Sequence, residues 1–453
     1  MTGRCAVRCI AFAALVSSTA APIRAADDSD PFALDGSRII TEERHFGIAS
    51  GRVALRVPYR NALSIGGMWA PPYVSSDFRI SMTLMDEPVA AERSTWHPTS
   101  VERAAKIHEV AVESITTLIP DTRAGVMQVT MHTPGVESRT VPISINVAGT
   151  LDRAERWEFA APESKTAASS SVVDGALRFE QGGMAVVVRG SAGIEWNGPQ
   201  RSGSATITLR PGSRETFYLT FAIGAVEEAD KTCASIASNP RKSISAARKA
   251  YDTRVGDLFR KLPRLESDNA ALENFYSRSL VHFIMNRWDV PEFALHPYFS
   301  TGSVNGGCVC NYLWNYGECW EILPLYDPAA NREHIKKFLS IDMMNHFSFE
   351  PLTGEAFGPW YPVNQEKIIG LISHHVRNTG DTAFLGETIS GKTVLAHALA
   401  NAMYGEDPAK PVSLIDYGPS NSHLELRRGL PYNHVMPDLN GRRYENYMLA
   451  ARP

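Results

Sequence analysis

The 453-residue sequence has no excess of charge of either sign. It holds 45 Lys and Arg against 49 Asp and Glu, a formal net charge of −4. Proteins that bind nucleic acid or an anionic membrane surface through their electrostatic field carry a clustered basic excess. The composition therefore gives no argument for either partner, and we expect none.

Long hydrophobic runs are also lacking, except at the N-terminus. There Arg4 and Arg8 precede the apolar run CIAFAALVSSTAA, and the small residues of PIRAADD follow. This run is too short to span a bilayer, and the pattern is typical of a secretory signal cut after Ala25 or Ala26. No Leu-x-Gly-Cys motif stands at that point. The sequence predicts a periplasmic or secreted protein with no integral membrane segment once residues 1–25 are removed.

Cysteine is scarce, with six residues in all. Removal of the signal would leave Cys233, Cys308, Cys310 and Cys319. An oxidising compartment permits a disulfide, for which Cys319 with Cys308 or Cys310 is the plausible pair. Thiolates also suit zinc, but this spacing matches no strong zinc template. We expect a disulfide or buried thiols, and neither a metal nor a cofactor.

Alternating apolar residues dominate residues 30–225. In DFRISMTLM the apolar side chains are Phe78, Ile80, Met82 and Leu84, and GVMQVTMH, VPISINV, ALRFEQGGMAVVVRG, SATITLRPG and ETFYLTFAI repeat the pattern. Strands of period two at short intervals, ended by Gly and Pro, indicate an antiparallel sandwich. The run KTAASSSVVDG is interpreted as an exposed loop.

The apolar period becomes helical after Arg241. Apolar residues from Ile244 to Leu262 share one helix face, and Pro263 ends it. Further helices are expected in DNAALENFYSRSLVHFIMNRW and at about 328–347, 363–378, 388–404 and 437–451, with no further strands. The predicted domains are a β-sandwich at 26–235, a helical linker at 236–265 and an all-α part at 266–453.

Aromatic residues and carboxylates share the loops between these helices. CNYLWNYGECWEILPLYDP contains Trp314, Glu318 and Glu321, and GEAFGPWYPVNQEKI contains Trp360, Asn364, Gln365 and Glu366. The C–H faces of a sugar stack on aromatic rings, and its hydroxyls need polar partners. Any single Trp is more often part of the hydrophobic core. Several loops in series that combine aromatic residues with carboxylates and amides favour a polar cleft that binds carbohydrate.

From about Asp268 the chain resembles the six-hairpin glycosidases, the (α/α)6-barrel superfamily of glucoamylase, trehalase and the processing α-glucosidases. NYLWNYGECWEILPLYDP is similar to the aromatic-acid loop of that superfamily, although Asn315 stands where relatives often have Asp. YPVNQEKIIGLISHHVRNTGDTAFL resembles one of its helical hairpins, and LIDYGPSNSHLELRRGLPYNHVMPDLNGRRYENY its mid-barrel acid loop. The resemblance implies an α/α toroid and glycoside cleavage with inversion of the anomeric centre.

Two carboxylates in the last of these segments are candidates for catalysis. Glycoside cleavage needs a protonated carboxyl at the leaving oxygen and a second, ionised carboxylate. Glu425 lies between Leu424 and Leu426, where apolar neighbours would raise its pKa, so we expect it to be the general acid, with Asp416 as the other candidate. His434 and Asn440 are expected to line the same mouth and bind substrate.

The count of helices is low for a closed toroid. A closed barrel of this type needs twelve helices, and about six follow the predicted linker. The resembled enzymes keep the catalytic base or nucleophile in the later half of the barrel. We therefore expect an incomplete (α/α)6 toroid in a truncated sequence, with the catalytic base beyond Pro453.

Four other hypotheses stay open. A polysaccharide lyase would use Tyr432, Asn433 and His434, but such lyases usually place the toroid before the sheets. A glycan phosphorylase shares the sandwich-first order, although export removes it from cellular phosphate metabolism. A zinc-dependent sugar hydrolase would use the three clustered cysteines. A carbohydrate-binding protein without catalysis would need no carboxylates in the aromatic loops.

Overall fold

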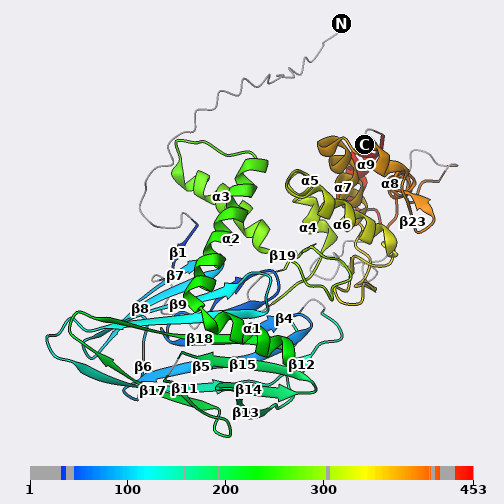
Figure 1. Ribbon diagram of the computed structural model, residues 1–453. Coiled ribbons are helices and arrows are strands. Elements are labelled where there is room, and N and C mark those ends of the chain that lie inside the picture. The colour runs from blue at the N-terminus through cyan, green and yellow to red at the C-terminus, as the bar shows by residue number, and fades with distance from the viewer. Residues whose placement is uncertain are drawn as a thin grey trace. The chain divides into compact units, whose positions relative to one another are not determined.

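Strands come first and helices second in the computed structural model, which describes residues 32–36, 45–157, 160–191, 193–302, 307–407, 409, 414–418 and 434–451. The predicted signal at 1–25 lies outside this range. Residues Phe32–Pro453 form one unit by their contacts. The prediction of an N-terminal antiparallel β-part followed by helices is confirmed (Figure 1).

Nine strands form the first sheet, each antiparallel to its neighbour: β1 (Leu34–Asp35), β7 (Arg93–His97), β8 (Ser100–Ile107), β9 (Val110–Ile119), β10 (Ala124–His132), β18 (Arg214–Ala225), β15 (Met184–Gly190), β14 (Ala176–Gln181) and β13 (Ser169–Val173). The segment KTAASSSVVDG, expected to be a loop, supplies β13. That prediction was wrong because β13 is an edge strand with mostly exposed side chains, which leaves little apolar alternation in its sequence.

Nine strands also form the second sheet. Its main path, in spatial order, is β16 (Glu195–Asn197), β17 (Ser202–Leu209), β11 (Arg139–Ala148), β5 (Tyr73–Leu84), β4 (Ser64–Ala70), β3 (Ala54–Pro58) and β2 (His45–Ala49), and β12 (Asp152–Arg153) and β6 (Glu87–Pro88) pair with β5. In β5 the apolar residues Phe78, Ile80, Met82 and Leu84 are buried, while Asp77 and Arg79 are exposed. One face of the strand therefore lines the core, as period-two alternation requires.

Three helices follow the last long strand: α1 (Val226–Ser238), α2 (Pro240–Lys261) and α3 (Ala270–Met285). Helix α1 packs on β15 and β18 and buries Ala229, Cys233 and Ile236 against them (Figure 1). Its first ten residues lie within the range predicted for the sandwich, where no helix was expected. Asn239 caps α2 by accepting a hydrogen bond from the Lys242 amide at 3.1 Å, and Pro240 occupies the first helical turn.

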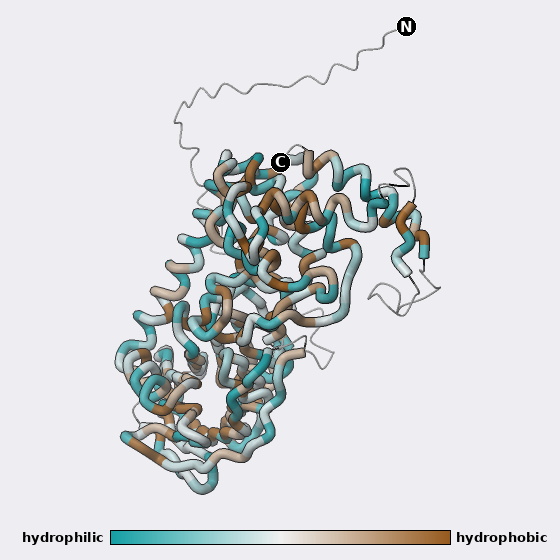
Figure 2. Tube along the Cα trace, turned by 90° about the vertical axis from the view of Figure 1, so that its right-hand side faces the viewer, coloured by the Kyte–Doolittle hydropathy of each residue, from teal (hydrophilic) through white to brown (hydrophobic). Residues whose placement is uncertain are grey.

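The remaining helices are α4 (Leu313–Gly317), α5 (Leu323–Tyr326), α6 (Pro328–Ser340), α7 (Asn364–Thr379), the 3₁₀ helix η2 (Thr382–Gly386), α8 (Val394–Ala402) and α9 (Pro437–Ala451). Their apolar sequence segments appear as brown stretches in Figure 2. Helix α7 is buried along most of its length and contacts α4, α5, α6, α8 and α9. It is therefore the central helix of this group.

Three short ladders contradict the expectation that no strands return after the sandwich. They are β19 (Arg287–Trp288) with β20 (Tyr298–Phe299), β21 (Ser348–Phe349) with β22 (Ala356–Phe357), and β23 (Thr388–Ile389) with β24 (Lys392–Thr393). Each strand has two residues, too few for alternation to show in the sequence.

Buried hydrogen bonds join the loops of the sandwich to loops of the helical part. The carboxylate of Glu350, fully buried, accepts the Trp157 amide and the Thr353 amide at 2.5 Å each. The Trp157 indole donates to the Gly307 carbonyl at 2.9 Å. Arg123, just before β10, pairs with Glu228 of α1 at 3.2 Å and with Glu292 at 2.5 Å. These contacts fix the sandwich against the loops that lead into α4 and α7.

Among the residues that the structure describes, no helix is both long and apolar enough to cross a membrane.

Candidate functional site

The N-terminal ends of α4, α7 and α9 meet at one place. Trp314, in the first turn of α4, contacts Tyr361, which lies just before α7. Glu366, in the first turn of α7, pairs with Arg442 of α9. Long loops enter all three helices at this end, and we refer to the region as the mouth. These loops are the segments in which the sequence predicted a carbohydrate cleft.

Four aromatic side chains form the first group at the mouth, which we call the Trp314 cluster: Tyr312, Trp314, Phe347 and Tyr361. The ring of Trp314 stacks on Tyr312 with centroids 4.4 Å apart and meets Tyr361 edge-on at 4.3 Å. Phe347 closes the group at 5.2 Å from Trp314. Trp314 and Tyr361 are half-buried, so part of each ring is open to solvent. An aromatic face of this kind can stack on a sugar ring.

A second group, the Trp360 cluster, consists of Trp360, Tyr404 and Tyr417. Tyr404 lies 5.3 Å from Trp360 and Tyr417 lies 6.2 Å from it, measured between ring centroids. Ile415, Met436 and Leu439 pack around these rings. Trp360 is buried, so it supports the loop that carries Asp416 rather than offering an open face. Because Trp360 and Tyr361 are consecutive, the loop before α7 joins the two clusters.

Charged groups pair at the first turn of α7. Glu366 is only 4% exposed and forms an ion pair with Arg442, while the Lys367 ammonium lies 3.7 Å from it. Lys367 also reaches Glu318 at 3.8 Å and lies over the Trp320 ring, 4.9 Å from its centroid. The carboxylate of Glu366 is thus satisfied by cations from two helices, which suits a positioning role better than direct contact with a sugar.

The other acids and amides predicted to bind substrate are placed differently from one another. Glu318 is 75% exposed at the mouth. Glu321 lies between α4 and α5, which both contact α7. Its backbone carbonyl accepts a hydrogen bond from the side chain of Asn378, near the C-terminal end of α7. Asn364 and Gln365 are buried in the first turn of α7, where the Asn364 amide donates to the Phe347 carbonyl at 3.3 Å. Glu318 and Glu321 are both exposed acids, and Glu318 is the one that lies beside Lys367 at the mouth.

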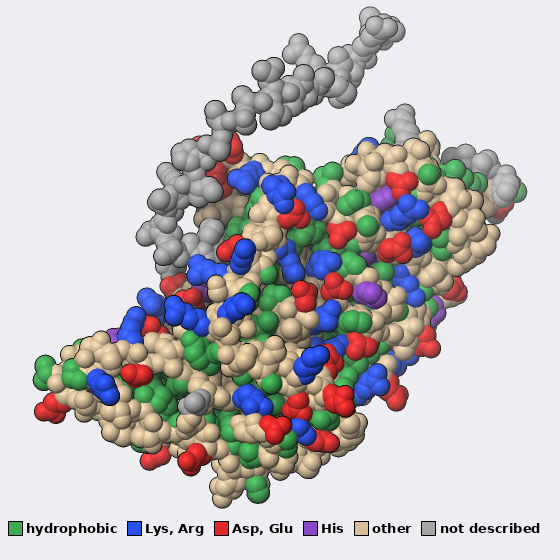
Figure 3. All heavy atoms as spheres, viewed as in Figure 1, with side chains coloured by type: hydrophobic (Ala, Val, Ile, Leu, Met, Phe, Trp, Pro, Cys, Tyr) green, Lys and Arg blue, Asp and Glu red, His purple; other side chains and the backbone are tan. Residues whose placement is uncertain are grey.

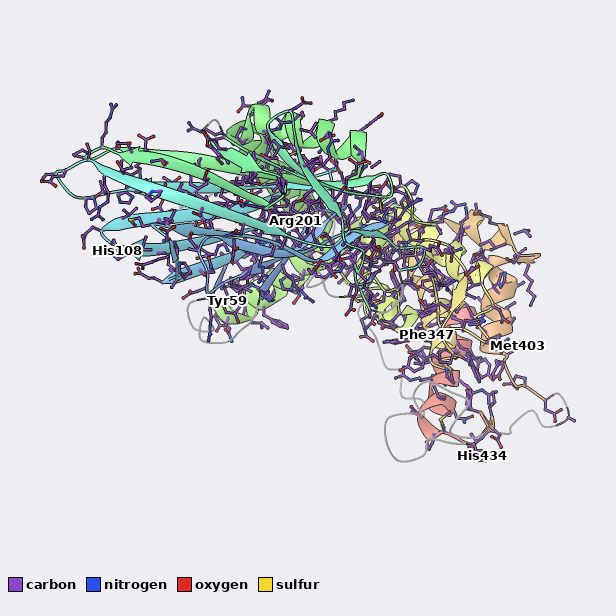
Figure 4. All side chains as sticks on the ribbon, turned by 90° about the horizontal axis from the view of Figure 1, so that it is seen from below. Tyr59, His108, Arg201, Phe347, Met403 and His434 are labelled. Atoms are coloured by element: carbon purple, nitrogen blue, oxygen red, sulfur yellow. The ribbon has the colours of Figure 1, made fainter. Side chains whose placement is uncertain are left out.

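Asp416 and His434 form a pair on the rim. His434 Nδ1 lies 3.0 and 2.9 Å from the two carboxylate oxygens of Asp416, and the Gly418 amide donates to the same carboxylate at 2.8 Å. The Gly418 and His434 hydrogen bonds lower the pKa of Asp416, which is 57% exposed. A carboxylate held ionised in this way is poorly suited to donate a proton at neutral pH. His434 lies near the start of α9 in Figure 4.

Asn440 holds the Asp416 loop against α9. Its side-chain oxygen accepts the Ile415 amide at 2.8 Å, and its nitrogen donates to the carbonyls of Ile415 and Met436 at 3.1 and 3.0 Å. Because the side-chain amide of Asn440 makes these hydrogen bonds, it positions the loop at the rim of the mouth. Glu425, the predicted general acid, and the lyase candidates Tyr432 and Asn433 lie outside the described residues.

Several residues of the mouth were not singled out from the sequence, namely Tyr312, Phe347, Lys367, Tyr404, Tyr417 and Arg442. The tyrosines and Phe347 lie in or beside the aromatic loops, so the composition of those loops was the available signal. Arg442 and Lys367 had no signal, because their partner Glu366 is far from Arg442 in sequence and its burial depends on the packing of α7 against α9.

The described residues contain no group of three or more His, Cys, Asp and Glu side chains that could hold a metal ion. Cys233, Cys308, Cys310 and Cys319 are all thiols. The face in Figure 3 shows Lys and Arg interspersed with Asp and Glu. The described side chains at the mouth carry aromatic, carboxylate, imidazole, amide, ammonium and guanidinium groups.

A cavity of about 220 Å³ lies elsewhere, between the C-terminal end of α6 and α8. Its lining includes Asp342, Lys392, His397 and Asn401. None of the predicted site residues lines it, and the His397 imidazole and the Asn401 amide are hydrogen-bonded to backbone carbonyls.

Comparison with known proteins identifies the fold. No protein-family model and no curated protein matches the sequence. A solved structure assigned as a kojibiose phosphorylase from the human microbiome matches 83% of this chain and 59% of its own, with a TM-score of 0.54 and 9% identity. A bacterial glucoamylase complexed with acarbose matches 74% of this chain and 57% of its own, with a TM-score of 0.45 and 10% identity.

At these identities the likeness shows the fold alone. The chain spans about 59% of the length of the kojibiose phosphorylase, which has a TM-score above 0.5. The β-part followed by helices is therefore similar in fold to that solved structure over 83% of this chain.

Proposed function

We propose that this chain belongs to an exported carbohydrate-active enzyme of the six-hairpin superfamily that hydrolyses glycosidic bonds in an oligo- or polysaccharide. The observation that carries the proposal is the convergence, at the ends of α4, α7 and α9, of a half-exposed aromatic cluster with the accessible carboxylates of Glu318 and Asp416. Aromatic faces can stack on a sugar ring, and carboxylates can accept hydrogen bonds from its hydroxyls. The fold likeness to a kojibiose phosphorylase supports this class of substrate.

Glu425 is the proton donor in this proposal. The low pKa of Asp416 favours its ionised form, so the protonated role goes to the carboxyl that lies between two leucines. In the reaction the acid would protonate the departing glycosidic oxygen while a second carboxylate activates water. The Trp314 cluster would stack the sugar, and Glu318 would accept hydrogen bonds from its hydroxyls. A carboxyl separation of about 6.5–9.5 Å indicates inversion, and about 5 Å indicates retention.

Replacement of the acid tests this assignment. Glu425→Gln keeps the size and hydrogen-bonding capacity of the side chain but removes its proton, so turnover should fall at least about 100-fold while sugar affinity stays within a few-fold. The measurement uses a protein that contains both catalytic carboxylates and compares hydrolysis of an oligosaccharide panel with affinity from calorimetry. Glu445→Gln, on the exposed side of α9, is the matched control. Unchanged turnover in Glu425→Gln would contradict the role, and a wild-type protein that neither binds nor cleaves any sugar would contradict the function.

Phosphorolysis is the second candidate, because the neighbour with the higher TM-score is assigned as a phosphorylase. A phosphorylase would use inorganic phosphate in place of water. Adding phosphate should then yield sugar 1-phosphate in proportion to substrate consumed, whereas a hydrolase yields only free sugar. The product analysis separates the two reactions.

A further inference from the structure

The segment Cys308–Cys310 lies at a structural junction. On one side, the Trp157 indole of the sandwich donates to the carbonyl of Gly307. On the other, Asn311 donates to the Phe349 carbonyl at 2.7 Å and Tyr312 begins the Trp314 cluster. A change in the backbone of these three residues would therefore reach both the joint with the sandwich and the mouth.

The two sulfur atoms of this segment face each other. Cys308 Sγ and Cys310 Sγ are 3.5 Å apart, within contact of two thiols. Gly302 lies so close to the first sulfur that a Cβ there would be 2.9 Å from it, so only glycine leaves room for the sulfur in this position. A disulfide has a sulfur–sulfur distance of about 2.05 Å, so closure needs an approach of about 1.5 Å.

The two thiols differ in access. Cys310 is 6% exposed, and both its contact with Cys308 and its burial raise its pKa. Cys308 is half-buried and is the more accessible residue of the pair. In such an arrangement the accessible thiol can form a mixed disulfide with a reagent, and the buried thiol can then attack that mixed disulfide and release the reagent.

We propose that Cys308 and Cys310 form a reversible intramolecular disulfide by exchange with a small-molecule or protein disulfide. The other described cysteines are arranged differently. Cys233 is enclosed between α1 and the first sheet, and burial raises its pKa to about 12. Cys319 follows α4, and burial raises its pKa to about 11. The inference does not depend on the proposed glycosidase function.

With glutathione disulfide as the oxidant, the exchange balances in two steps. The Cys308 thiol loses its proton to water, its sulfur attacks one glutathione sulfur, and the other glutathione leaves as a thiolate that takes up a proton. The Cys310 thiol then loses its proton, its sulfur attacks Cys308 Sγ, and the second glutathione leaves in the same way. Two cysteine thiols are oxidised and one glutathione disulfide is reduced to two glutathione molecules.

Closure of this ring would disturb the hydrogen bonds that position the segment. The Cys310 carbonyl accepts the Thr301 amide at 2.8 Å, the Val309 carbonyl accepts the Tyr298 hydroxyl at 2.7 Å, and the Thr301 hydroxyl accepts the Tyr312 amide at 2.8 Å. Movement of the two sulfur atoms toward each other pulls on the backbone between them. The oxidised form should therefore hold Tyr312 and Trp314 differently from the dithiol.

The test uses the full chain incubated in glutathione buffers that range from reducing to oxidising, with a chelator present. Remaining thiols are then alkylated and the peptide Trp288–Arg332 is analysed by mass spectrometry. The Cys319→Ser protein should show a loss of about 2 Da in this peptide, protected from alkylation and reversed by dithiothreitol. Cys308→Ser should lose the bond, and Cys310→Ser should instead accumulate a mixed glutathione disulfide on Cys308.

Hydrogen exchange of the peptide around 307–316 supplies an independent readout. Oxidation of the Cys319→Ser protein should change its exchange at least two-fold, and Cys308→Ser treated in the same buffers should show no change. A wild-type bond that joins Cys319 to either partner would overturn the proposal. Persistence of the dithiol in the most oxidising buffer would overturn it as well.

Discussion

A buried guanidinium holds one corner of the sandwich. Arg103 of β8 is 2% exposed and donates to the carbonyls of Pro58, Asn61 and Ser64 and to the Thr116 hydroxyl, at 2.5–3.1 Å. Burial lowers its pKa to about 9. Its donors therefore satisfy backbone groups of the loop between β3 and β4 that water cannot reach.

Replacing Arg103 by Ala should lower the free energy of unfolding by about 3 kcal/mol, because the change opens a cavity and leaves these acceptors unpaired. Urea unfolding measures the effect. Arg93→Ala, at an exposed position on the neighbouring strand β7, should change stability by less than about 0.5 kcal/mol. Equal losses in the two variants would refute the role given to Arg103.

His334 of α6 is a buried neutral imidazole. Its Nδ1 donates to the Ala330 carbonyl at 2.7 Å and its Nε2 accepts the Phe299 amide at 3.1 Å. Burial lowers its pKa to about 4, from 6.5. Between these two values the unfolded chain binds a proton that the folded protein does not. The stability present above about pH 6.5 is thus progressively lost as the pH falls toward 4.

The loss attributable to His334 should reach at most about 3 kcal/mol at pH 4. His334→Gln, which cannot titrate, should have a shallower fall in unfolding free energy between pH 6.5 and 4 than the wild type, whatever its stability at pH 7. The measurement is urea unfolding at a series of pH values. Parallel pH curves for the two proteins would show that His334 does not carry this dependence.

At the scale of elements, the packing of α7 against α9 depends on a charged contact. Glu366 is buried between Arg442 and Lys367, and truncating one member of a buried pair leaves an uncompensated charge. Arg442 is itself partly exposed, which reduces the effect.

Glu366→Gln should therefore destabilise α9 relative to α7 by about 1–3 kcal/mol. Hydrogen exchange at residues 437–451 should rise while exchange within the sandwich is unaffected. Glu445→Gln, an exposed acid of the same helix, is the control. Unaltered protection of α9 in Glu366→Gln would mean that apolar contacts alone, such as that of Leu439, hold this helix.

At the scale of the whole molecule, Glu350 joins the sandwich to the helical part through the Trp157 amide. An amide in place of the carboxylate keeps one acceptor but directs an NH₂ group at a backbone N–H. Glu350→Gln should therefore cost about 2 kcal/mol and separate the unfolding of the two parts into distinct calorimetric transitions.

Glu355→Gln is the matched control for this prediction, because the Glu355–Arg156 pair is exposed and should contribute less than about 1 kcal/mol. If the Glu350→Gln protein has the same calorimetric transitions as the wild type, Glu350 does not couple the unfolding of the two parts.

The sequence by itself determined the succession of strands and then helices. Apolar alternation in segments such as β5 and the helical period of α2, ended by Pro263, are local properties that the chain carries wherever it packs. The same local chemistry marked the aromatic loops as the place of the mouth. It failed for β13 and for the two-residue ladders, because an exposed edge strand and a very short pairing leave no apolar period.

Only the tertiary structure decided which of these loop residues face one another. The ion pair of Glu366 with Arg442, and the pairing of His434 with Asp416, join residues that are distant along the chain. The lowered pKa of Asp416 has one local cause, the Gly418 amide, and one that depends on the fold, the His434 side chain. The contact between Cys308 and Cys310 joins near neighbours, but it required a backbone course that spacing alone left open. Local pattern specifies elements, whereas the environment of a charge is a property of the folded whole.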